Sequence, residues 1–334
     1  MKKSLLALAV LGAFAGVASA QSSVTIYGLL DQSVAKSNGG TANNPGSPGA
    51  TSAYQVQQSA GSRLGFRGSE DMGGGLSAQF QIEHRFSPDT GAAGNAASFW
   101  QGRSYVQVTA AAAGSLYMGR DYTPSFWPAV KSDPFGWDGV GQIGAEAWAG
   151  YLTPNAGQGS GVRTSNTVGF KSASFGGLTV QGAVGLSENS TTGRTNGFNV
   201  EYGGGPIYAA LGYESVTNGT QNKQGVINGA FHYDLGVVKL MAYGVQAKLG
   251  TNGSTKAKMF SLGLRAPIGP GVLKAQAYRV DPDGAANNRT KFGIGYDYSL
   301  SKRTNLYVDF GQAKSDVVGT TSNRAAAVGM KHTF

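Results

Sequence analysis

The 334-residue chain contains no cysteine, so disulfide scaffolds, thiolate metal sites and cysteine nucleophiles are excluded. Charged residues are sparse, at 13% of the chain, and they give a formal net charge of +9. Glycine, by contrast, supplies 53 residues, about twice the share of an ordinary protein. A disordered chain is excluded because 40% of the residues are apolar and 10% aromatic. Collagen is excluded because no Gly-x-y period is present.

Long apolar runs are missing after the first twenty residues. Lys2 and Lys3 precede an apolar run from Leu5 to about Val17, which is followed by an A-x-A sequence ending at Ala20. This order is typical of a secretory signal peptide, and the run is too short to span a bilayer comfortably. We expect residues 1–20 to be cleaved after Ala20. Residues 21–334 then form the exported protein, which either stays soluble or inserts in a membrane as strands.

The rest of the chain alternates apolar and polar residues with a period of two. In Leu76–Glu83, Leu, Ala, Phe and Ile alternate with Ser, Gln, Gln and Glu. Such alternation predicts a strand with one apolar and one wet face. Similar runs occur in Val24–Ser33, Ser62–Gly68, Arg103–Ala110, Ser115–Asp121, Val162–Lys171, Leu178–Ser187, Phe198–Tyr202, Ile207–Tyr213, Val226–Leu235, Val237–Gln246, Phe260–Ala266, Leu273–Val280, Lys291–Tyr298, Asn305–Gly311 and Arg324–Phe334.

The breaks between these runs are alternately short and long. Asp71–Gly75 and Gly203–Pro206 are short, whereas Gly39–Ala53 and Ser87–Ala97 are long. This rhythm is typical of an outer-membrane barrel, with tight turns on one side and long loops on the other. We predict an all-β fold, a 16-stranded antiparallel transmembrane β-barrel whose lumen holds water. A soluble exported β-sandwich that acts as a binding protein is the alternative, because its strands alternate too.

One connection, Tyr122–Gly161, is much longer than the others. It contains four prolines, which disfavour continuous strand pairing. It also contains too many aromatic residues for a freely solvated loop, namely Phe126, Trp127, Phe135, Trp137, Trp148 and Tyr151. A loop of this length in a compact fold is usually functional. We predict that it folds into the lumen and narrows the channel, the alternative being an extracellular cap.

Strand parity indicates which charged side chains face the lumen. Arg63 and Arg67 lie opposite Leu64 and Phe66, and the wet face of Leu76–Glu83 ends in Glu83, with Arg85 next in phase. A ring of charge at the narrowest point of a pore selects ions by sign. The same reasoning places these further residues inside: Arg103 and Tyr105, Arg163 and Lys171 (opposite Val162, Val168 and Phe170), Lys274, Lys291 and Asp309.

The last strand ends in an aromatic residue. Phe334, His332, Met330 and Val328 share one face of the run Arg324–Phe334. A terminal aromatic on the lipid face of the closing strand is typical of the outward aromatic girdle of such barrels.

Five motifs make the chain resemble the general porins of beta-proteobacteria, which include the neisserial porins. They are SVTIYGLLD at Ser23–Asp31, SRLGFRGSED at Ser62–Asp71, GRDYTP at Gly119–Pro124, LSKRT at Leu300–Thr304 and GMKHTF at Gly329–Phe334. The resemblance implies a 16-stranded barrel, a homotrimer in the outer membrane and a third loop folded into the pore.

The resemblance also implies an arginine cluster on the barrel wall that faces this loop. Arg63, Arg103 and Arg163 stand at the matching positions, and Glu83 resembles the carboxylate beside them. Candidate acids of the constriction loop are Asp133, Asp138 and Glu146. Each arginine has an alternative role in a wall ladder that never touches the ion path.

Other classes of site find no support. His84, His232 and His332 are far apart without metal-ligand spacing, and Gly73–Gly75 lacks the context of a phosphate loop. Basic residues are dispersed at strand spacing, so nucleic-acid binding is not expected. We expect no metal, no cofactor and no catalysis.

The sequence therefore predicts a passive diffusion channel for small hydrophilic solutes and ions in the outer membrane of a Gram-negative bacterium, with a mild preference for anions. A substrate-selective channel with a binding site in loop 122–161 is the alternative. Expected partners are two further copies of the chain, outer-membrane lipid and lipopolysaccharide, the outer-membrane assembly machinery acting on the C-terminal strand, and small anionic or neutral solutes.

Overall fold

The computed structural model describes residues 23–42, 52–96, 98–149, 162–187, 193–217, 223–249, 253–283 and 288–334. The expected signal peptide, residues 1–20, lies outside these ranges. The strands are β1 (Ser23–Ser37), β2 (Tyr54–Gln57), β3 (Arg63–Gly73), β4 (Leu76–Ser87), β5 (Ala92–Ala93), β6 (Arg103–Ala110), β7 (Gly114–Tyr122), β8 (Arg163–Ser172), β9 (Leu178–Gly185), β10 (Arg194–Gly204), β11 (Ile207–Thr217), β12 (Lys223–Asp234), β13 (Lys239–Leu249), β14 (Thr255–Ile268), β15 (Gly271–Pro282), β16 (Arg289–Ser299), β17 (Thr304–Ser315) and β18 (Asn323–Thr333). The helices are α2 (Phe126–Lys131) and the 3-10 helix η1 (Gly144–Trp148).

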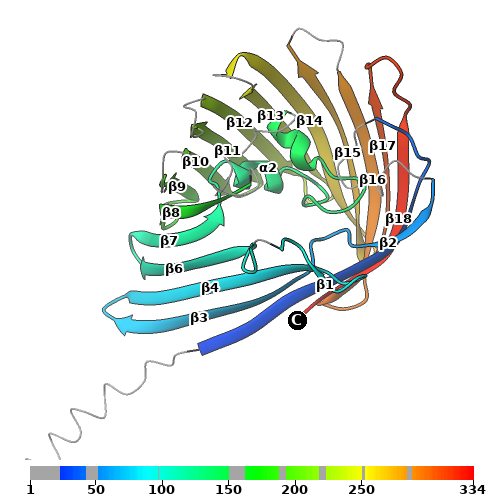
Figure 1. Ribbon diagram of the computed structural model, residues 1–334. Helices are drawn as coiled ribbons and strands as arrows, with labels where there is room; N and C mark the ends of the chain where they lie inside the picture. Colours follow the sequence, from blue (N-terminus) through cyan, green and yellow to red (C-terminus); the bar gives the residue numbers. More distant parts are fainter. Residues whose placement is uncertain are drawn as a thin grey trace, which may run out of the picture.

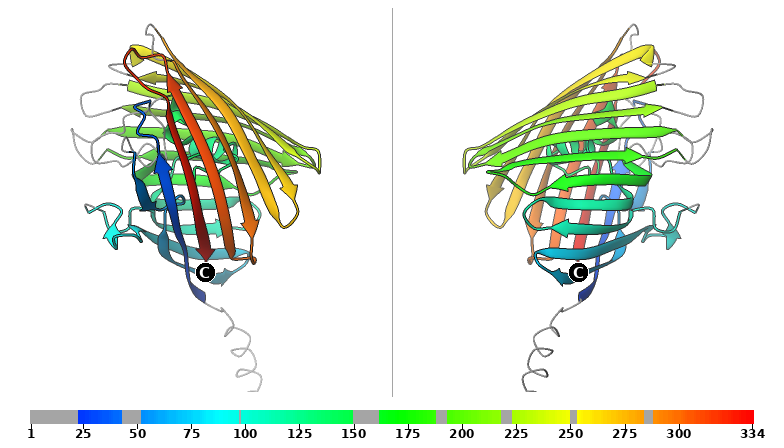
Figure 2. Two further views of the ribbon diagram at one scale, coloured as in Figure 1. Left: turned by 90° about the vertical axis from the view of Figure 1, so that its right-hand side faces the viewer. Right: turned by 90° about the vertical axis from the view of Figure 1, so that its left-hand side faces the viewer.

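The long strands form one closed antiparallel barrel (Figure 1). Each pairs with its neighbours in chain order, and β1 closes the ring by pairing with β18. In the described ranges sixteen long strands make the wall, while the short β2 and β5 pair with β1 and β4 inside long connections. The predicted 16-stranded barrel is therefore confirmed, and the β-sandwich is excluded because a sandwich needs two separate sheets. The strands run obliquely around the barrel (Figure 2), as closure requires.

The predicted alternation of connections is confirmed as well. β3 and β4 are joined only by Gly74 and Gly75, whereas β1 and β3 are separated by residues 38–62. Gly73, Gly74 and Gly75 all have positive φ, between 62° and 80°, which is why glycine occupies this turn. In the described part of the chain, no helix is long and apolar enough to cross a membrane.

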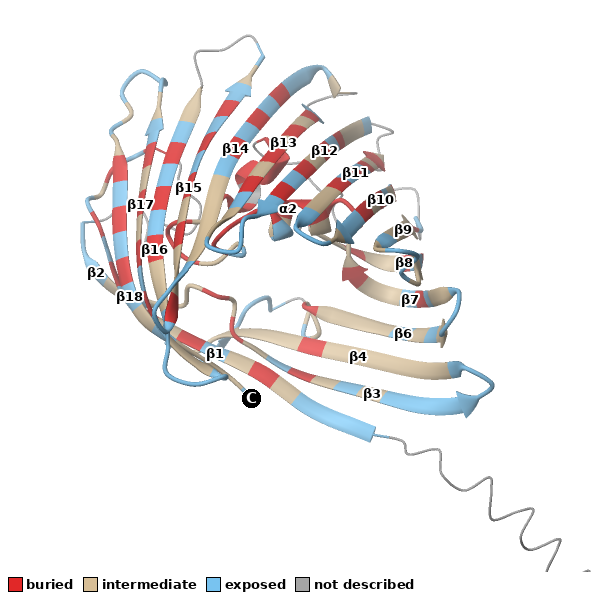
Figure 3. Ribbon diagram, turned by 180° about the vertical axis from the view of Figure 1, so that it is seen from behind, coloured by how far each residue is buried: buried red, intermediate tan, exposed pale blue. Residues whose placement is uncertain are grey.

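Apolar side chains of the wall point outward. On β14, Phe260 and Leu262 are each 56% exposed, while Met259 and Ser261, which alternate with them, are each 3% exposed. The same alternation appears as red and pale blue bands along β16 and β17 (Figure 3). An apolar outer surface of this extent is stable only in contact with lipid, because its exposure to water costs free energy.

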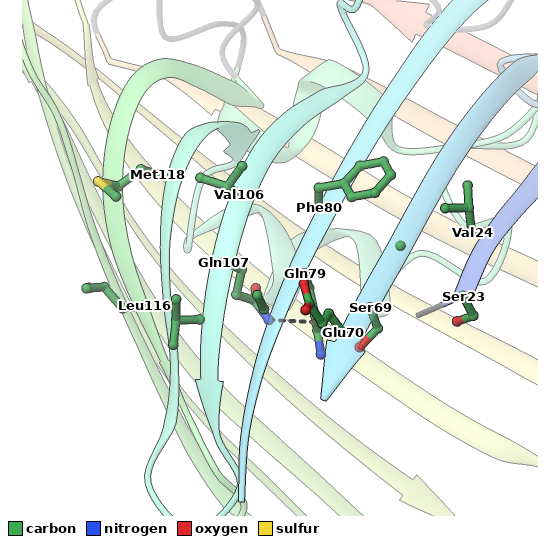
Figure 4. Close-up of a pocket in the computed structure, with 13 residues that line it drawn as sticks. Ser23, Val24, Ser69, Glu70, Gln79, Phe80, Val106, Gln107, Leu116 and Met118 are labelled. Atoms are coloured by element: carbon green, nitrogen blue, oxygen red, sulfur yellow. Dashed lines mark hydrogen bonds between the residues drawn. The ribbon is translucent and has the colours of Figure 1, made fainter. Parts of the chain in front are cut away.

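The inner face is more apolar on one side than the predicted alternation implied. Four apolar side chains face the lumen here and are shielded from its water, because the long loop packs over them; they are Val226, Val245, Met259 and Val280. On the opposite side the inner face is polar. There the Gln107 amide donates to the Gln79 carbonyl oxygen at 3.0 Å. Figure 4 shows this bond together with the outward Phe80, Val106 and Met118, which line a hollow of about 400 Å³ on the outer face.

Hydrogen bonding carries several strands beyond their apolar runs. β10 begins at Arg194 and β14 at Thr255, before the alternating runs that were predicted to start at Phe198 and Phe260. Backbone pairing needs no apolar side chain, so polar residues beyond the apolar run continue the ladder. Val162, predicted to face lipid, instead packs on the loop inside the barrel. It precedes β8, so strand parity does not apply to it.

The C-terminal residue lies on the seam of the barrel. The backbone N–H of Phe334 donates to the Gly28 carbonyl at 3.1 Å, and the Gly28 N–H returns the bond to the Phe334 carbonyl. The Phe334 ring lies directly over Gly28, where a Cβ would clash with it. Its side chain is 43% exposed on the outer face, and it therefore covers the junction of β1 and β18.

Candidate functional site

The connection between β7 and β8 folds into the barrel, as the sequence predicted (Figure 1). Helix α2 packs against β10, β11 and β12, and η1 packs against β13 and β14. Residues 150–161 of this loop, with Tyr151 and Pro154, lie outside the described ranges. The described part covers one side of the lumen wall and leaves the side formed by β3, β4 and β6 facing it.

Helix α2 is fastened to the wall by polar side chains. Asn199 and Asn228 donate to the carbonyls of Pro124 and Ser125, at 2.8 and 2.9 Å. The hydroxyl of Ser125 donates to the Glu214 carboxylate. The hydroxyl of Ser132 lies 2.9 Å from the His232 ring nitrogen Nε2. These contacts join the residues on either side of the helix to β10, β11 and β12 and fix its position across the lumen.

Asp133 organises the turn that follows α2. Its carboxylate accepts hydrogen bonds from the backbone N–H groups of Phe135, Trp137 and Ile143, at 2.9, 3.0 and 3.0 Å. Burial raises the pKa of this carboxyl to about 6, although the three bonds act in the opposite direction. Asp133 is 3% exposed, so it shapes the loop from within.

The end of the loop is anchored by Glu146. Its carboxylate is fully buried and pairs with Arg289 of β16 at 2.9 Å. Burial raises the pKa of Glu146, and the positive charge of Arg289 lowers it in part. The Tyr243 hydroxyl donates to the neighbouring carbonyl of Ala147 at 3.0 Å. Asp133 therefore stabilises the loop itself, and Glu146 attaches the loop to the barrel wall.

Two glycines of the wall make room for the loop. A Cβ on Gly293 of β16 or on Gly311 of β17 would lie less than 3.0 Å from backbone oxygens of Gly141 or Val140. The loop backbone therefore lies directly on the sheet at these positions, which side chains of any size would prevent. Part of the high glycine content serves this close approach.

Opposite the anchored side, the loop and the wall enclose a cavity of about 380 Å³. The wall contributes four arginines and one carboxylate, and the loop contributes aromatic rings and one carboxylate. The main lining residues are Arg63, Glu83, Arg85, Arg103, Arg163, Tyr122, Phe126, Trp127, Trp137 and Asp138.

Two of the four arginines form ion pairs with acids. Arg85 pairs with Glu83 at 2.7 Å, and Arg103 pairs with Asp121 at 2.7 Å. Lys171 shares the second carboxylate oxygen of Asp121, also at 2.7 Å. The sequence reasoning did not single out Asp121, although it lies in the GRDYTP motif in phase with Tyr117.

Arg63 and Arg163 are different, because no carboxylate of the described residues lies within ion-pair distance of either. Arg63 donates through Nε to the Gly61 carbonyl at 3.1 Å. Arg163 donates to the Tyr122 hydroxyl, and its guanidinium lies 4.1 Å from the centre of the Tyr122 ring. The cavity thus carries an excess of positive charge.

Asp138 is the loop carboxylate that lines this cavity. It pairs with Lys331 at 3.6 Å. Burial raises its pKa to about 6, and the positive charges of Lys331 and Arg63 oppose that rise. A fall in pH through about 6 therefore removes its negative charge.

The structure brings together Arg63, Arg103, Arg163, Glu83 and Asp138 from the predicted set. Two other predicted residues lie outside the cavity lining. Arg67 packs its guanidinium 5.4 Å from the centre of the Tyr27 ring, further along β3. Lys171 lies behind the lining at Asp121.

Further along the wall, the inward placement of Lys274 and Asp309 is confirmed, since the two residues pair at 3.2 Å and both are buried. Lys291 is buried on the same side of the barrel. In the described ranges no group of acids and histidines could hold a metal ion.

Known proteins share this architecture. Outer membrane porin protein 32 of Delftia acidovorans is 34% identical, over 98% of this chain and 94% of that protein. Major outer membrane protein P.IB of Neisseria meningitidis serogroup B is 26% identical over the full length of both. The structure titled anion-selective porin from Comamonas acidovorans superposes with a TM-score of 0.81 at 29% identity, covering 94% of this chain and 100% of that one. The family model described as Gram-negative porin matches residues 7–317. The chain belongs to the Gram-negative porin family.

Proposed function

We propose that this outer-membrane porin is a passive diffusion channel for small hydrophilic solutes and ions, with a mild preference for anions, and that it has no catalytic activity. The carrying observation is the pair of arginines, Arg63 and Arg163, that lack an acidic partner among the described residues and line the cavity between loop and wall. A structural relative at 29% identity is titled an anion-selective porin, which supports the same sign of preference.

The physical reason is electrostatic. A guanidinium stays charged at any physiological pH, and fixed charges at a constriction raise the local concentration of the opposite ion. Arg85 and Arg103 are offset by Glu83 and Asp121. The preference therefore rests on two unpaired arginines rather than four, which is why we expect it to be mild.

The test is a planar-bilayer recording of the purified protein under a KCl gradient. We expect an open channel whose reversal potential has the sign of chloride permeation, with a conductance that rises with salt and does not saturate steeply. A reversal potential of zero, or one with the sign of potassium permeation, would contradict the anion preference. Absence of channel conductance would contradict the diffusion function itself.

We further propose that the mature protein starts at Gln21 and assembles as a homotrimer. The outer hollow over β1, β3, β4, β6 and β7 supports a protein contact there, because it interrupts the lipid-facing surface (Figure 4). Lipopolysaccharide and the assembly machinery that reads the C-terminal strand are the other expected partners. Crosslinking in isolated outer membranes tests the stoichiometry, and N-terminal sequencing tests the cleavage site.

A further inference from the structure

We propose that the cavity between loop and wall is a binding subsite for carboxylates attached to a flat apolar body, with aromatic monocarboxylates as the preferred class. This inference rests on the proposed function, since it requires an open pore in which the solute reaches the cavity. It names the solute class that the channel favours among small anions.

The first observation is an apolar wall where ion passage alone requires none. Tyr122 at the end of β7, together with Phe126, Trp127 and Trp137 of the loop, lines the same cavity as the arginines. A hydrated inorganic ion gains nothing from such a surface. A solute that carries a ring buries apolar surface when it packs on these side chains, and this burial favours its binding.

The aromatic residues are held in fixed positions. The Phe126 ring stacks on Tyr122 at 4.3 Å and meets Trp137 edge-on at 4.9 Å. Trp127 lies 5.4 Å from Tyr122 and 5.6 Å from Phe126, at the margin of the cluster. Trp127 and Trp137 are half-buried, so both belong to the rigid cluster while part of each side chain stays accessible.

The second observation is a pair of unused hydrogen-bond donors at the cavity. Among the described residues, the Nε of Arg163 and the indole Nε1 of Trp137 are buried and have no acceptor. Buried donors without acceptors are rare in native proteins. A carboxylate solute would supply acceptor oxygens for these donors. It would also give Arg63 and Arg163 the negatively charged partner that they lack among the described residues.

The two walls meet at Arg103. Its guanidinium lies 5.3 Å from the centre of the Tyr122 ring and 5.7 Å from that of Trp127. A solute whose carboxylate lies toward Arg63 and Arg163 therefore has its apolar body next to Trp127. An acetate ion satisfies only the charged half of this site, and a neutral ring satisfies only the apolar half.

The experiment compares benzoate with acetate as blockers of chloride current through the intact protein in planar bilayers. We expect saturable block by benzoate at a concentration about tenfold lower than for acetate, since one aromatic contact is worth up to about that factor. Benzamide, which has the ring without the charge, should block no better than acetate. Equal block by benzoate and acetate would overturn the inference.

Two variants locate the effect. Trp127→Ala should bring benzoate to the level of acetate while the reversal potential in KCl stays on the chloride side. Trp127→Leu keeps apolar bulk without a ring and should also reduce the difference between benzoate and acetate. It provides the test if the alanine variant fails to insert. Trp100→Ala is the matched control, because Trp100 packs on Phe66 and Phe99 outside the cavity and should preserve the tenfold difference.

The outcomes separate the two proposals. A benzoate preference that survives both Trp127 variants would place the site elsewhere and refute the assignment. Wild-type channels that prefer chloride without distinguishing benzoate from acetate would leave the proposed function intact and remove only this inference. Channels that prefer potassium would refute the proposed function instead.

Discussion

Reversing the charge of Arg63 and Arg163 should convert the channel from anion to cation preference. The double substitution Arg63→Glu with Arg163→Glu replaces two positive charges at the cavity by two negative ones. Arg85 and Arg103 stay paired with Glu83 and Asp121, so they cannot compensate. The two unpaired positive charges of the cavity are thereby replaced by negative ones.

The size of the effect follows from Coulomb's law. An ion about 7 Å from each site, in water, interacts with each unit charge by about 0.6 kcal/mol. The change of four units amounts to about 2.4 kcal/mol, which screening at about 0.1 M salt roughly halves. Chloride is disfavoured and potassium favoured by about 1.2 kcal/mol each. The permeability ratio should therefore change by about 50-fold.

The assay is the reversal potential in a KCl gradient, where a perfectly selective channel gives about 59 mV for each factor of ten in concentration. The double variant should reverse on the opposite side of zero from the wild type. Arg279→Glu with Arg324→Glu is the matched control, because both side chains are exposed on outward positions of β15 and β18. An unchanged reversal potential in the cavity variant, or an equal shift in the control, would refute the role of Arg63 and Arg163.

Three further results are expected. Anion preference should rise as the pH falls through about 6, because protonation of Asp138 removes a negative charge from the cavity; in Asp138→Asn the reversal potential should change less across that range than in the wild type. Asp133→Ala should loosen the loop, since each lost bond to its carboxylate is worth about 1.5–3 kcal/mol; faster proteolysis within the loop and noisier single-channel current would report it, and a quiet, resistant channel would contradict it. Gly293→Val should displace Gly141 from the wall and change the conductance, whereas Gly229→Val, on a glycine whose added Cβ meets its neighbours only at ordinary contact distance, should not.

Much of the site follows from local pattern. Arg63, Glu83 and Arg103 were placed on the lumen side by alternation alone, because a strand sends successive side chains to opposite faces. Register then follows from antiparallel pairing, which sets Glu83 beside Arg103. The loop's inward course was predictable from its aromatic content, since a long apolar segment needs a surface to cover.

The partners of each charge were beyond the sequence. Asp133 and Glu146 look alike as loop acids, yet Asp133 binds backbone N–H groups, Glu146 pairs with Arg289, and only Asp138 lines the cavity. Those differences depend on how a loop without a repeating pattern packs against eight distant strands, β10–β17, and no local rule specifies such contacts.

The sequence by itself determined a closed barrel with an apolar outer surface and alternating turns and loops. It also determined the face of the wall to which each arginine side chain points. All of these follow from the two-residue period of a strand. Only the tertiary structure decided which arginines keep their charge unopposed. Arg85 and Arg103 meet Glu83 and Asp121, and Arg63 and Arg163 meet none among the described residues, because ion pairs form between side chains that closure and loop packing bring within a few ångströms.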